Sequence, residues 1–181
     1  MNNEMMNHES GLSLRDALFL GFCAVFTVVF RMAFRWHLGI SGHAMFYTLA
    51  LLLLARGSVN FRWSASCVGT LSGLMALILG LGKGGPLVVA KFLFPAVAVD
   101  LSALIWPLFF ESYIAIALVA ALASATKFLN SIVMDWLVGM DRVLILQRAL
   151  IDAAGAILFG VAGSLLVPPV LRRLKARGVI Q

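Results

Sequence analysis

Charged side chains are scarce in this chain of 181 residues: Lys, Arg, Asp and Glu together make up 12% of it, whereas hydrophobic residues make up 62%. The mean hydropathy is +1.01. A soluble domain of this length could not hide so much apolar surface from water, so the solvent of most of the chain must be a lipid bilayer. The composition therefore predicts one polytopic membrane domain.

Cysteine and acidic residues are also few. Cys23 and Cys67 lie inside apolar segments without the spacing of a metal site, and we interpret both as small core residues. Eight acidic residues face 14 basic ones, which gives a net charge of +6. The basic residues are spread along helix ends, and no basic run is interleaved with aromatics. This pattern does not indicate nucleic-acid binding.

The chain lacks the motifs of a membrane enzyme. Its serines form neither a nucleophile elbow nor a pattern with a suitably spaced lysine. His37 and His43 are six residues apart with no acid between them, unlike the H-E-x-x-H pair of a metalloprotease. We therefore expect a protein that is not an enzyme and that carries no cofactor.

Six apolar stretches predict membrane helices in residues 13–172. A polar tail, 1–12, precedes them without the basic region and cleavage pattern of a signal peptide, and a basic tail, 173–181, follows them. The expected class is an all-α integral membrane protein with six transmembrane helices. The expected spans are 14–36, 43–56, 63–81, 86–107, 112–138 and 148–170.

Basic residues predict how these spans are oriented. Six spans place both termini on one side, and Lys and Arg concentrate in cytoplasmic segments of membrane proteins. The termini are therefore expected to be cytoplasmic, and the loops near 37–43, 82–86 and 139–147 external. The basic residues on the terminal side are Arg15, Arg56, Arg62, Arg172, Arg173, Lys175 and Arg177.

Small residues repeat at four-residue spacing in two of the spans. Such ladders let a neighbouring helix approach closely, and here a neighbour within the same chain is expected. The ladders are Ala65, Gly69 and Gly73 in the third span and Ala156, Gly160 and Ser164 in the sixth.

A glycine-rich bend before the fourth span is the first candidate for a binding site. Glycines around Lys83 allow close approach of a ligand, and the helix that starts after Gly85 offers free N–H groups to an anion. Lys91 follows inside an apolar helix, where a charge is costly unless it faces protein or a water-filled cavity. The alternative is that the glycines only make a tight turn and that Lys83 marks the water interface.

Further polar residues concentrate in the outer halves of the spans. Lys127, Asn130 and Asp135 are spaced to share one face of the fifth span, and Arg148 and Asp152 are four residues apart in the sixth. Basic residues outnumber acidic ones in this region, so a cavity that opens to the outside here is expected to attract an anion. The alternative is that all these charges form structural ion pairs or extend to the membrane interface. The candidate substrate-binding residues are His43, Lys83, Gly84, Gly85, Lys91, Lys127, Asn130, Asp135, Arg148 and Asp152.

Two short sequences carry a resemblance to a known family. Ser41-Gly42-His43 and Gly82-Lys83-Gly84-Gly85 are similar to the Gly-His and Gly-x-Gly-Gly stretches of cobalt and nickel S components. With its six expected spans, outward cavity and small-residue ladders, the chain resembles the substrate-binding S component of an energy-coupling factor (ECF) transporter, the vitamin and trace-metal uptake system. The metal S components bind through an amino-terminal Met-His, whereas this chain begins Met1-Asn2-Asn3, which favours an organic vitamin or precursor.

The resemblance implies partners as well as a solute. An S component captures its solute in the inner membrane of a prokaryote and docks on a transmembrane coupling subunit that works with two cytoplasmic ATPases. Ala17, Gly21 and Ala24 in the first span are candidates for the docking face, because small residues at this spacing let a partner helix pack closely. The alternatives are a cobalt or nickel S component and a membrane accessory subunit that transports nothing.

Overall fold

The computed structural model describes residues 13–35, 42–81, 85–106, 109–110, 112–137 and 139–177. These residues form seven α-helices and no strand, so the predicted all-α class is confirmed for the described part of the chain. The helices are α1 (Leu14–Arg35), α2 (Ala44–Ser58), α3 (Ser64–Ile78), α4 (Leu87–Ile105), α5 (Tyr113–Leu137), α6 (Arg142–Ser164) and α7 (Val167–Ala176).

Four helical stretches are long and apolar enough to cross a membrane, which indicates a membrane protein. Helices α2 and α3 have 15 residues each. At 1.5 Å per residue each spans about 22 Å, less than the roughly 30 Å of a hydrocarbon core. Four stretches of the described chain therefore meet the length criterion, whereas the sequence predicted six spans. They are Leu14–Ala33, Leu87–Ile105, Tyr113–Leu137 and Arg142–Ala176.

Helix boundaries agree with the predictions within three residues for the first five helices, but the sixth prediction, 148–170, is wrong at both ends. Helix α6 begins six residues earlier, after the extended residue Asp141, and ends at Ser164. Pro168 and Pro169 do not close the segment, because proline is tolerated in the first turn of a helix and these two lie at the start of α7. The expected boundary between residues 172 and 173 consequently falls inside α7.

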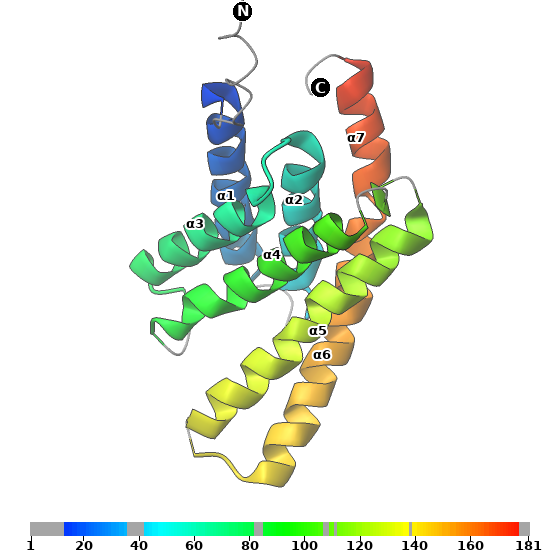
Figure 1. Cartoon of the computed structure of the whole chain (residues 1–181). Helices are drawn as coiled ribbons and strands as arrows, with labels where there is room; N and C mark the ends of the chain where they lie inside the picture. The colour runs from blue at the N-terminus through cyan, green and yellow to red at the C-terminus, as the bar shows by residue number, and fades with distance from the viewer. Residues whose placement is uncertain are drawn as a thin grey trace, which may run out of the picture.

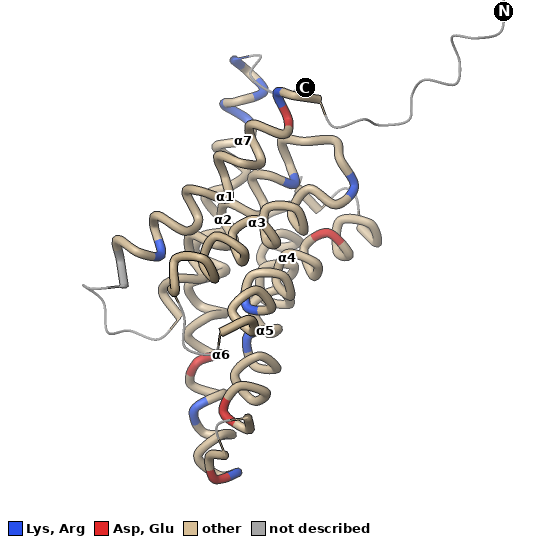
Figure 2. Tube along the Cα trace, turned by 90° about the vertical axis from the view of Figure 1, so that its left-hand side faces the viewer, with Lys and Arg blue, Asp and Glu red and all other residues tan. Residues whose placement is uncertain are grey.

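The two described ends of the chain lie at the same end of the bundle (Figure 1). Helices α5 and α6 form a long antiparallel pair that extends away from that end, and α3 and α4 run obliquely beside each other. Many of the basic residues lie at the end of the bundle where the termini lie (Figure 2). The opposite end, near the α5–α6 turn, carries both acidic and basic residues.

Both small-residue ladders pack inside the bundle as predicted. A methyl group added at Gly69 would lie 2.8 Å from the carbonyl oxygen of Phe92 on α4, and one added at Gly73 would lie 2.9 Å from the Cα of Val89. Gly160 in α6 is similarly close to Leu49 on α2 and to Ser124 on α5. These contacts leave no room for a larger side chain, so the glycines set the distances between the helices.

One buried carboxylate joins three helices at the terminal end of the bundle. Asp100 on α4 is fully buried, and its Oδ2 accepts a hydrogen bond from the Ser66 N–H at 2.7 Å while its Oδ1 accepts one from the Ala65 N–H at 3.3 Å. These are free N–H groups of the first turn of α3, whose N-cap residue, Trp63, makes no side-chain capping bond. Arg56 on α2 completes the cluster with Nε 3.4 Å from Oδ1.

Replacing Asp100 with alanine should strongly destabilise the protein. The change leaves two N–H groups of α3 and the Arg56 guanidinium without their anion, and breaking a buried ion pair in this way typically costs about 3–5 kcal/mol. Thermal unfolding of the detergent-solubilised protein measures the effect. Asp141→Ala is the matched control, since Asp141 is exposed and makes no side-chain cap bond to α6. Equal melting temperatures for the two variants would contradict the assigned role.

Candidate substrate-binding pocket

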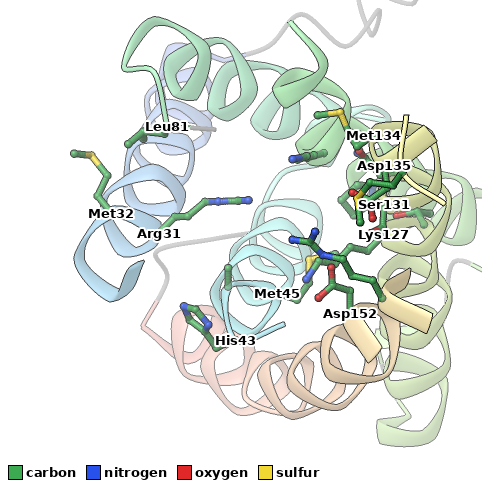
Figure 3. Close-up of a pocket in the computed structure, with 17 residues that line it drawn as sticks. Arg31, Met32, His43, Met45, Leu81, Lys127, Ser131, Met134, Asp135 and Asp152 are labelled. Carbon is green, nitrogen blue, oxygen red and sulfur yellow. The ribbon is translucent and has the colours of Figure 1, made fainter. Parts of the chain in front are cut away.

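A cavity of about 650 Å³ is lined by helix segments on the side of the bundle away from the termini. Five helices contribute to it: the end of α1, the start of α2, the first half of α4, the second half of α5 and the first half of α6 (Figure 3). Its lining is Arg31, Met32, His43, Ala44, Met45, Leu81, Lys91, Pro95, Thr126, Lys127, Asn130, Ser131, Met134, Asp135, Met140, Arg148 and Asp152.

Most of the site residues predicted from the sequence meet at this cavity. Gly85 does not: it is an exposed residue with a φ of 54° in the turn before α4 and is not part of the lining. Lys83 and Gly84 lie outside the described residues. The predicted residues that line the cavity are His43, Lys91, Lys127, Asn130, Asp135, Arg148 and Asp152.

The polar stripe of α5 forms one wall of the cavity. Lys127, Ser131 and Asp135 project from this helix on the same side, as their four-residue spacing requires (Figure 3). Asn130 lies among them; the residue is 6% exposed and borders the cavity. Among the described residues no hydrogen bond joins its side-chain amide to another group, so this amide is available to a bound molecule.

Cations reach the cavity from opposite walls. Arg31 extends from α1 toward the α5 side (Figure 3), and its guanidinium carbon lies 4.6 Å from the centre of the Phe92 ring. Lys91 is within electrostatic range of Arg31 and of two carboxylates, those of Asp135 and Asp152. Lys127 is within range of Asp152, Arg31 and Lys91. The charges of four helices thus act on one another across this cavity.

The two carboxylates are too few to neutralise the cations. The described lining holds four cationic side chains, Arg31, Lys91, Lys127 and Arg148, against the carboxylates of Asp135 and Asp152. One carboxylate oxygen of Asp135, Oδ2, is buried without a hydrogen-bond partner in the described part of the chain. The field in the cavity is therefore positive, and it acts in surroundings where charges are screened less than in water.

Sequence reasoning missed the apolar part of the lining and the role of Arg31. Arg31 lies in the outer half of the first expected span. It was not among the candidate site residues, because an arginine near a helix end commonly extends to the membrane interface. The apolar residues gave no signal, since nearly every position of a membrane helix is apolar. They include Met32, Met45, Leu81, Pro95, Met134 and Met140.

The small residues of α1 do not form one free face. Ala17 is exposed, and a side chain added at Gly21 would meet no atom within 4 Å. Ala24, however, is 1% exposed, and its carbonyl oxygen accepts a hydrogen bond from the Ser72 hydroxyl of α3 at 3.3 Å. Ala24 is therefore removed from the predicted docking face, because its small side chain serves packing within the chain.

Comparisons with known proteins identify no relative: no protein-family model, no curated protein and no solved structure matches this chain. In the described residues, no group of three or more His, Cys, Asp and Glu side chains is placed to hold a metal ion. The geometry and charge of the cavity are therefore the features from which a function can be inferred.

The positive field predicts how a thiol in the cavity reacts. With Cys23 and Cys67 replaced by alanine, a Ser131→Cys variant should react faster with an anionic thiosulfonate reagent than with a cationic one of similar size. We expect the ratio of the two rates to exceed that of an exposed Ser112→Cys control by about threefold or more, because like charges are repelled and opposite charges attracted. Equal ratios at the two positions would mean that the cavity is not positive.

Proposed function

We propose that this chain is the substrate-capturing membrane subunit of an ATP-driven micronutrient uptake transporter, of the ECF S-component kind, and that it binds a small anionic organic solute. The observation that carries the proposal is the cavity itself. It has the volume of a small-molecule site, about 650 Å³, and gathers most of the cationic side chains that lie inside the bundle. Charges enclosed by membrane helices are costly and are characteristic of substrate pathways.

The charge of the cavity also bears on the kind of solute. A bare divalent metal ion would be repelled by four cationic side chains that exceed the carboxylates in number. An organic anion would instead be attracted, with the apolar lining in contact with its carbon skeleton. A vitamin or a vitamin precursor with an acidic group fits this description.

The proposed orientation follows from the basic residues at the terminal end. Cytoplasmic termini would place Arg172, Arg173 and Lys175 of α7 inside, as the positive-inside rule requires, and would open the cavity to the outside. In this arrangement the short helices α2 and α3 also cross the membrane, enclosed by the longer helices. The protein would then be a six-span protein of the prokaryotic inner membrane.

A capture subunit needs partners that supply energy. We therefore propose that the loaded chain docks on a transmembrane coupling subunit and that two cytoplasmic ATPases drive its reorientation. Ala17 and Gly21 remain candidates for the docking face, since both border open space on α1.

Cysteine labelling of intact cells tests the orientation. In a chain without its native cysteines, Asp141→Cys in the turn between α5 and α6 should react with a membrane-impermeant maleimide added outside, whereas Ala176→Cys at the end of α7 should react only after the membrane is opened. Both positions are exposed, so accessibility within the protein does not limit either reaction. The reverse pattern would place the cavity on the cytoplasmic side.

Mass spectrometry of small molecules retained by the purified protein tests solute capture. Lys91→Met should lower the retained amount at least tenfold, because losing a charged contact typically costs about 2–5 kcal/mol of binding. Lys175→Met changes the same residue type on the exposed face of α7 and should leave retention unchanged. If the wild-type protein retains only a bare metal ion, or nothing, the proposed function is wrong.

A further inference from the structure

Among the described lining residues, cationic side chains exceed carboxylates by two. Arg31, Lys91, Lys127 and Arg148 face two carboxylates, and His43 adds no charge when it is neutral. An excess of cations over carboxylates around a partly enclosed cavity is unfavourable, because fewer water molecules can solvate the charges there than at an open surface. A bound molecule that brought two negative charges would neutralise the cavity, whereas a monoanion would leave one positive charge uncompensated.

The cations are also distributed over the cavity walls. Arg31 is carried by α1, Lys91 by α4, Lys127 by α5 and Arg148 by α6, so no two of them share a helix. Arg31 points across the cavity toward the wall that carries Lys127 (Figure 3). This arrangement fits two anionic groups set apart on one molecule better than a single compact dianion held at one point.

The remaining lining suits the body of such a molecule. Met32, Met45, Met134 and Met140 line the cavity together with Leu81. Methionine side chains are flexible and polarisable, so they adapt to the outline of an apolar ring or chain. The amide of Asn130, which lines the cavity, has both donors and an acceptor, and it can fix the orientation of a polar group between the two anionic ends.

We infer that the solute is an organic dianion whose two acidic groups are separated by an apolar body. This inference rests on the proposed capture function and narrows its substrate class. Two acidic groups would be matched by cations on opposite walls, and the apolar body would displace water from the thioether-lined part of the cavity.

A matched pair of probes tests the number of charges. Isophthalate carries two carboxylates on a benzene ring, and 3-carbamoylbenzoate has the same shape with one carboxylate replaced by a neutral amide. Both are smaller than the cavity. At about 10 mM, where even millimolar affinity is detected, isophthalate should raise the melting temperature of the purified protein more than 3-carbamoylbenzoate, with binding at least about tenfold tighter.

Variants with one cation fewer test whether the cavity sets this preference. Lys127→Met should reduce the preference for isophthalate at least about tenfold, because one carboxylate would lose its counter-charge, while Lys175→Met should leave the preference unchanged. Arg148→Met repeats the test at an exposed cation and covers the case in which Lys127→Met does not fold.

The possible outcomes separate this inference from the proposed function. Equal binding of the two probes, tighter binding of the monoanion, or no binding of either overturns the dianion inference. It is also overturned if the molecule retained by the wild-type protein is neutral or carries one negative charge, although solute capture would then stand. If the wild-type protein retains no organic solute, the capture function itself fails, whatever the probes do.

Discussion

The arrangement of the helices depends most on the two hydrogen bonds and the ion pair made by the buried carboxylate of Asp100. The N-cap residue of α3, Trp63, makes no side-chain cap bond, so the N–H groups of Ala65 and Ser66 have no acceptor on their own helix. Asp100 supplies that acceptor from α4, and Arg56 compensates its charge from α2. The cluster fixes where α3 begins relative to α4, and the glycine contacts at Gly69 and Gly73 then hold the two helices together along their length. Since α4 also carries Lys91, the position of one pocket cation follows from a cluster at the other end of the bundle.

The two ends of the bundle thus use buried charge differently. At the terminal end, the Asp100 carboxylate accepts hydrogen bonds from two N–H groups and pairs with an arginine, so its negative charge is compensated within the fold. At the opposite end, cations of four helices surround a cavity with too few carboxylates to match them. The excess of cationic over acidic side chains in the described lining is the physical basis of the proposed binding site.

The sequence predicted much of this arrangement. Apolar periodicity placed five helices within three residues, and small-residue spacing correctly predicted that another helix of the chain packs closely on α3. The spacing of Lys127, Asn130 and Asp135 predicted one polar face of α5, and all three line the cavity. The sequence did not predict that Ala24 is buried, because inside-facing and lipid-facing positions of a membrane helix are equally apolar. For the same reason, the sequence did not predict that four methionines line the cavity. The restart of the chain as α7 was missed because a proline pair can begin a helix as well as end one.

The cavity is lined by five of the seven described helices. A solute held there would contact several of these helices at once, and it would bind the folded chain but not the unfolded one. Thermodynamic linkage then requires that occupancy stabilise the bundle, by about 2.7 kcal/mol when the free solute is at a hundredfold excess over its Kd. Occupancy would also restrict the motion of the helices relative to one another. A partner that never reaches the cavity could therefore distinguish a loaded molecule from an empty one by its rigidity alone.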